Sequence, residues 1–202
     1  MRRVTKLALG IGIPVAVVLI TAVLLISFSI KTVGAGEVCV LLNKHDKSVN
    51  NKTYQKGVHF IGLINHLSPA LPDEGGSILG AIQAGGTTKP EHPDQSEGDS
   101  ATAYVFFKYY IGKDNAHAFF RENGYNLTAM EIPNVFTKKM MDVVRDLLSQ
   151  YTCSEINNEA IPQDSWCKWF AGNASILMRN QSLPFVLDPN DPVRAVFFSS
   201  NC

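Results

Sequence analysis

The side chains that most often catalyse reactions or bind metals are scattered along this chain. No metal-binding HExxH motif and no nucleophile-bearing GxSxG motif occurs in it. No other ligand spacing links its histidines, which are His45, His59, His66, His92 and His117. The sequence therefore predicts no metal, no cofactor and no catalytic residues.

Two further patterns resemble functional sites, one a phosphate-binding loop and the other an acid–base pair, but neither has the features that such a site needs. The segment GAIQAGGTT at residues 80–88 has no lysine after its second glycine, which a phosphate-binding loop needs. Asp142, Arg145 and Asp146 share the polar side of a predicted helix, which is typical of a solvated face. We therefore expect a protein that is not an enzyme.

Cysteine and asparagine patterns point to covalent modification. The cysteines are Cys39, Cys153, Cys167 and Cys202, and none form the CxxC pairs of zinc or thioredoxin sites. Cys153 with Cys167 is the disulfide that we expect, and free buried thiols are the alternative, above all for Cys39. Possible glycosylation sites in N-x-S/T sequons are Asn51, Asn126, Asn173 and Asn180.

The N-terminal region contains an uncharged, mostly apolar run at residues 7–30. A helix of that length would cross a bilayer core, which predicts one transmembrane signal-anchor. Cleavage near residues 33–36 is the alternative. The basic residues within 1–6 place the N-terminus in the cytosol or a matrix, with residues 31–202 on the other side. The sequons agree with that orientation and predict the plasma membrane or an endomembrane, with the mitochondrial inner membrane as the alternative.

The rest of the chain reads as one α+β domain, of short antiparallel strands and amphipathic helices. Apolar runs at 37–42 and 57–64 predict a hairpin, and residues 102–111 predict a strand with alternate residues buried. Residues 114–123, 132–151 and 163–179 predict helices, and the C-terminal segment predicts one or two strands broken at Pro189 and Pro192.

Glycines and prolines interrupt residues 68–100, which predicts a flexible insertion. Its apolar centre, SILGAIQA, would contact a bilayer, a neighbouring subunit or its own domain. Charge is balanced, with 18 Lys and Arg against 18 Asp and Glu, so no basic surface for nucleic acid is expected.

Two segments near the start of the domain, TVGAGEVCVLLN and KGVHFIGLI, contain Gly36, Glu37, Gly57, His59 and Phe60. They resemble the opening strands of the SPFH (band 7) domain family, and the motifs that follow keep that family's order. YVFFKYYIGKDNAHAFFRENG resembles its next strand and short helix. FTKKMMDVVRDLLSQYTCSEI resembles a later helix, through Arg145, Tyr151, Thr152 and Glu155. The family includes stomatins, prohibitins and flotillins.

The resemblance implies a membrane-anchored, non-enzymatic scaffold that oligomerises laterally through the helix at 132–151. Its expected partners are the lipid bilayer, copies of itself or related SPFH proteins, and other membrane proteins. The chain lacks the long coiled coil that usually follows the family's domain. The alternative function is a single-pass surface glycoprotein or accessory subunit that binds one protein partner.

Overall fold

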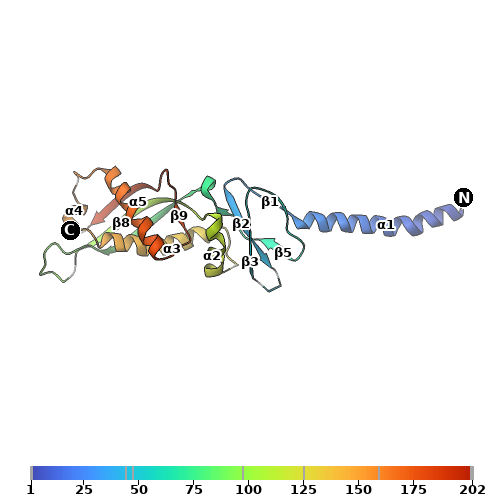
Figure 1. Cartoon of the computed structure of the whole chain (residues 1–202), viewed down its shortest axis with the longest axis horizontal. Helices are drawn as coiled ribbons and strands as arrows, with labels where there is room; N and C mark the ends of the chain where they lie inside the picture. The colour runs from blue at the N-terminus through green and yellow to red at the C-terminus, as the bar shows by residue number, and fades with distance from the viewer. Residues whose placement is uncertain are drawn as a thin grey trace.

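The computed structural model describes residues 2–43, 45–46, 48–96, 98–124, 126–158 and 160–200, without the side chains of residues 2–13, Asn51 and Ser200. The molecule is elongated, and helix α1 (Arg2–Ser29) projects from one end of it (Figure 1). Helices and strands follow in an α+β arrangement, with small sheets next to α1 and a larger sheet beyond them.

Helix α1 differs from the anchor that the sequence predicts. It ends at Ser29, because Ile30 already pairs with Phe60 in a sheet. Within the part of the chain whose side chains are described, no helix has both the length and the apolar character to cross a membrane. The predicted transmembrane helix at residues 7–30 is therefore wrong. The signal-anchor, the single-pass topology and the membrane locations derived from it are wrong as well.

Two small sheets lie between α1 and the rest of the molecule. In the first, β1 (Ile30–Val33) pairs with β4 (Gly57–Phe60). In the second, β2 (Glu37–Asn43) lies between β3 (Val49–Tyr54) and β5 (Asn65–Leu67), and β6 (Leu71–Pro72) pairs with the start of β2. The predicted hairpin of 37–42 with 57–64 is wrong, because the polar segment between them supplies β3, which takes the place beside β2.

The large sheet has the order β10–β8–β7, and every pairing in it is antiparallel. Its central strand is β8 (Ser100–Tyr110), flanked by β7 (Ile78–Thr87) and β10 (Val193–Ser200), and β9 (Val186–Leu187) pairs with the end of β8. The predicted flexible insertion at 68–100 thus contains a ten-residue strand. Its glycines do not break that strand, because β8 pairs with it along its whole length.

One face of the large sheet is covered by helices (Figure 1). Helix α3 (Ile132–Leu148) runs along β7, and the predicted start at Ile132 with Pro133 in the first turn is confirmed. Predicted helices 114–123 and 163–179 correspond to α2 (Lys113–Asn123) and α5 (Gln163–Asn180). A short 3-10 helix, η1 (Glu74–Gly76), precedes β7, and α4 (Cys153–Ile156) follows α3.

The core forms where α3 meets the sheet. The rings of Tyr109 and Phe136 are stacked, with centroids 3.5 Å apart and planes 5° apart. Phe185 lies edge-on to both rings. This stack lies directly above Gly80 of β7, where a Cβ would be 2.6 Å from Phe136 Cε1 and 3.0 Å from Tyr109 Cε1. Only a residue without a side chain leaves room for the two rings at this position.

We expect Gly80→Ala to destabilise the protein by about 1–3 kcal/mol, because the added methyl group overpacks a core that cannot move aside. Gly85→Ala on the same strand is the matched control, since its Cβ would meet Thr102 Oγ1 at an ordinary 3.5 Å. Urea unfolding of both variants measures the difference. Equal stability of the two would contradict the tight fit.

Candidate functional site

The first family motif forms the turn into β2. Gly36 has φ +73°, and a Cβ on it would lie 2.7 Å from the Cα of Gly76. The Glu37 carboxylate accepts a hydrogen bond from the Gly34 N–H at 3.0 Å. Both residues therefore shape the backbone here.

The second motif lies on β4. Gly57 has φ +147°, and His59 Nε2 lies 2.7 Å from the Gln55 carbonyl oxygen. The His59 ring also contacts Tyr54 edge-on, with centroids 4.8 Å apart. Phe60 is exposed. Hydrogen bonding and ring packing account for His59 without a catalytic role.

The last motif, which contains Arg145, Tyr151, Thr152 and Glu155, lies at the end of α3 in the larger part of the molecule. Arg145 donates from Nε to the Gly85 carbonyl and pairs with Asp142 at 2.9 Å. Tyr151 packs against two tryptophans, and its burial raises its pKa to about 12. Thr152 and Glu155 form the capping box of α4. The three motifs therefore do not converge on one site.

The sequon asparagines differ in accessibility. Asn126 and Asn180 are exposed, whereas Asn173 is half-buried and donates from Nδ2 to the Trp169 carbonyl at 3.0 Å. The side chain of Asn51 lies outside the described residues. Asn126 and Asn180 are thus the accessible acceptors among the described sequons.

The expected disulfide is wrong. Cys153 is disulfide-bonded, but Cys167 carries a free thiol, so the two are not joined. Cys39 is also free and buried, as the alternative interpretation expects, and burial raises its pKa to about 11. A thiol with that pKa is a poor nucleophile at neutral pH.

The described residues include no group of three or more His, Cys, Asp or Glu arranged to hold a metal ion. Asp142 is mostly exposed and its carboxylate accepts from Arg145. It belongs to the solvated helix face that the sequence predicts.

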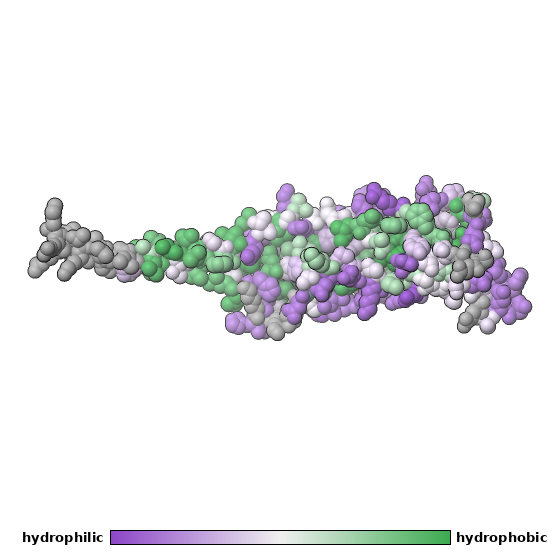
Figure 2. Space-filling view, turned by 180° about the vertical axis from the view of Figure 1, so that it is seen from behind, coloured by the Kyte–Doolittle hydropathy of each residue, from purple (hydrophilic) through white to green (hydrophobic). Residues whose placement is uncertain are grey.

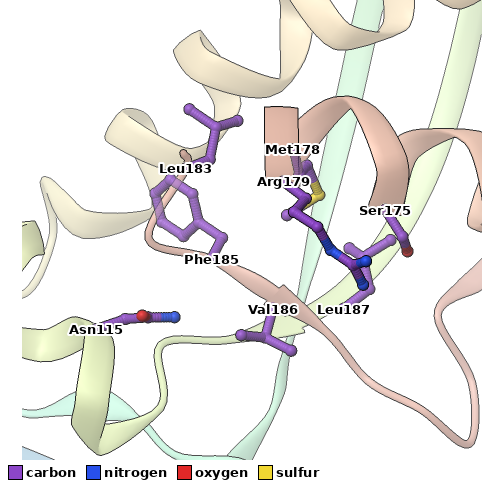
Figure 3. Close-up of a pocket in the computed structure, with 8 residues that line it drawn as sticks. All are labelled: Asn115, Ser175, Met178, Arg179, Leu183, Phe185, Val186 and Leu187. Atoms are coloured by element: carbon purple, nitrogen blue, oxygen red, sulfur yellow. The ribbon is translucent and has the colours of Figure 1, made fainter. Parts of the chain in front are cut away.

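A cavity of about 380 Å³ lies between the end of α5, β9 and α2 (Figure 3). Arg179 and Asn115 are on opposite sides of it, and Val186 lies between them. The remaining lining residues are Ser175, Met178, Leu183, Phe185 and Leu187. Its lining is mixed, with the polar Asn115, Ser175 and Arg179 among apolar side chains, and it contains no acid–base pair.

Ser182 closes α5 next to this cavity in an unfavourable conformation. Its φ is +53°, and its N–H donates to the Arg179 carbonyl while the Leu183 N–H donates to that of Met178. These two bonds form a Schellman motif, in which the left-handed position is usually glycine. Serine there costs about 1 kcal/mol, because its Cβ crowds the backbone.

We expect Ser182→Gly to stabilise the protein by about 0.5–1 kcal/mol, which would raise Tm by about 1–4 °C. Ser175→Gly is the control, because it lies inside α5 on an exposed position and should destabilise by about 0.5–1 kcal/mol. Calorimetry of the two variants should give shifts of opposite sign. A fall in Tm with Ser182→Gly would exclude strain at this position.

A buried carboxylate ties the end of β9 to the large sheet. Asp188 accepts a hydrogen bond from the Ser77 hydroxyl at 2.5 Å and from the Asn190 N–H, and pairs with Lys108 at 3.1 Å. In that order, these partners lower the pKa of Asp188 to about 2. The contact also neutralises the Lys108 charge on the sheet surface.

The Asp188 contact is expected to weaken in acid. Its folded pKa lies below its unfolded value, so its contribution is present above pH about 4 and is lost as the pH falls towards 2. Urea unfolding at pH 5, 4, 3 and 2 should show a smaller loss of stability in Asp188→Asn than in the parent. Parallel pH profiles would contradict this, since the other carboxylates are common to both proteins.

The second face of the large sheet is left uncovered by the described elements. Burial alternates along β7 and β8, so that every other residue faces solvent. Leu79 is 50% exposed and Phe197 55% exposed, and Phe106 contacts Phe197 edge-on. Figure 2, seen from behind Figure 1, shows apolar surface on this end of the molecule, away from α1.

On this open face, small side chains flank Phe106, whereas larger ones flank Tyr104. Phe106 lies between Ala81 and Ala195, and Tyr104 lies between Gln83 and Phe197. Lys108 is the charged residue among these positions, and Asp188 pairs with it. The face therefore mixes large apolar side chains with polar ones such as Gln83, and the Lys108–Asp188 pair leaves it close to neutral.

A second apolar surface lies at the other end of the molecule. Side chains of α1 from Val15 to Phe28 are exposed, and the nearby Phe60, Leu63 and Ile64 form a shallow hollow with Leu25 and Ile26. Exposed apolar side chains that adjoin one another in this way are typical of interaction surfaces.

Sequence reasoning did not identify the open sheet face. The alternating pattern of residues 102–111 was correct, but its solvent-side aromatics give no sign of whether another layer covers them. The Asp188 network was also missed, since Ser77, Lys108 and Asp188 are distant in sequence. The segment SILGAIQA was the one available signal, as a possible subunit contact.

No family model matches this chain, and no curated protein matches its sequence. The resemblance to SPFH domains thus gains no support from the comparisons.

Proposed function

We propose that this protein is a non-enzymatic scaffold whose copies associate through the open face of the β10–β8–β7 sheet. The observation that carries the proposal is the exposure of Leu79, Tyr104 and Phe197 on one continuous sheet face. Apolar surface of this kind gains free energy when it is removed from water.

The shape of the face favours a second copy over an unrelated surface. Two such faces related by a two-fold axis can place the large Phe106 and Phe197 of one copy over the small Ala81 and Ala195 of the other. Sheets that stack in this way interdigitate their side chains at a spacing of about 10 Å. The pairing of Lys108 with Asp188 leaves no net charge to repel the second copy.

Phe197→Lys should weaken self-association at least about tenfold, because a charge replaces an apolar side chain in the contact. Ile176→Lys is the matched control, since Ile176 on α5 is 57% exposed and lies away from this face. Sedimentation velocity over a concentration series, in density-matched mild detergent that covers α1, measures both.

The proposal fails if the unaltered protein sediments as a monomer at roughly 100 µM, where even weak specific contacts form. It also fails if the two lysine variants behave alike. Binding to a lipid bilayer stays a prediction. It would involve the exposed apolar side chains of α1, not the open sheet face.

A further inference from the structure

The two edges of the large sheet are built differently. Both β10 and β7 have a sheet neighbour on one side only. An edge strand offers unpaired N–H and C=O groups to any other chain, and proteins usually block this with charge, proline, a bulge or a covering group.

The β10 edge carries several of these blocks. Its register shifts between Val193 and Ala195, and the exposed Arg194 lies at that irregularity. Gln163 donates from Nε2 to the Val196 carbonyl at 2.6 Å, so α5 occupies part of the edge.

The β7 edge carries almost none. Its sequence, ILGAIQAGGT, contains no charged residue and no proline over ten residues. Its pairing with β8 runs from Ile78 to Thr87 without a bulge, so the strand stays straight enough to accept another. Among the described side chains, Arg145 reaches its backbone, and only at Gly85 near the end of the strand.

We propose that β7 pairs antiparallel with β7 of a second copy, which joins two four-stranded sheets edge to edge. The inference extends the proposed scaffold, since it supplies a second contact that differs from the open face. An uncharged strand can pair with itself about a two-fold axis without bringing like charges together.

The pairing geometry limits where the axis can lie. Directly opposed residues in an antiparallel pair have their side chains on the same side of the sheet. The two-fold axis between the two β7 strands must therefore pass beside one residue, and not between two neighbouring residues. The central residues of β7 are Ile82 and Gln83. With either centre, the two copies of Gln83 are opposite or diagonal neighbours, with Cα atoms within about 8 Å.

The joined sheet would continue the open face across both copies. With the axis beside Ile82, Gln83 of one copy would lie opposite Ala81 of the other; with the axis beside Gln83, the two copies of Gln83 would be opposed. Tyr104 and Phe106 on β8 would flank them on each side. Edge pairing and face stacking together hold more than two copies, which is the property that a scaffold requires.

The test is cross-linking of the full-length chain through an introduced cysteine. Gln83→Cys places a thiol on the exposed side of β7 near the proposed axis, and Ser199→Cys places one on the exposed side of β10. Both are made together with Phe197→Lys, which removes the face contact. The Phe197→Lys chain alone gives the background from the native thiols.

A short bismaleimide should convert most of the Gln83→Cys chain to a covalent dimer at low micromolar concentration. The Ser199→Cys chain should stay at background. Equal cross-linking of the two, or none with Gln83→Cys, would overturn the edge pairing.

The outcomes separate the two proposals. Association that depends on Phe197 without cross-linking at Gln83 leaves the scaffold proposal standing and removes the edge contact. Cross-linking at Gln83 in a protein whose association ignores Phe197 supports the edge contact and removes the face contact. A partner other than a second copy would leave both cysteine variants monomeric, which overturns the inference.

Discussion

The stacking of Tyr109 on Phe136 above Gly80 is the contact on which the larger part of the molecule depends. It joins the central strand β8 to helix α3, and Phe185 closes the same cluster from the segment before β9. The stack requires that β7 present a residue without a side chain beneath the rings. Because α3 packs closely against Gly80, it covers one face of the sheet along β7.

Burial on one face leaves the other to solvent. Antiparallel sheets commonly bury one side and solvate the other, with polar residues on the open side. Here the open side carries the apolar Phe106, Phe197 and Leu79 beside the polar Gln83 and Lys108. The Asp188–Lys108 pair removes the one charge among the register positions described. The same sheet also has one blocked edge, at β10, and one unblocked edge, at β7. Its two faces and its two edges therefore differ in what they expose to solvent.

Prediction from sequence succeeded where local periodicity decides the structure. Helix α3 was predicted because apolar residues recur at helical spacing, and strand β8 because they alternate. Prediction failed where contacts with segments distant in the sequence decide the structure. Residues 78–87 form a strand because β8 pairs with them, although glycines weaken their own strand tendency. The predicted hairpin failed because β3 and β1 took the positions beside β2 and β4. The predicted transmembrane span failed because no helix among the residues whose side chains are described has both the length and the apolar character to cross a membrane.

The sequence by itself determined the α+β class, the positions of α2, α3 and α5, and the balanced charge, since these follow from composition and short-range periodicity. The tertiary structure alone decided which sheet face is covered and which edge stays open. It also decided that Ser77, Lys108 and Asp188 meet, and that Cys153 does not bond Cys167. The physical reason is that a side chain's type does not specify what will lie opposite it. That depends on long-range packing, which brings together residues far apart in the chain.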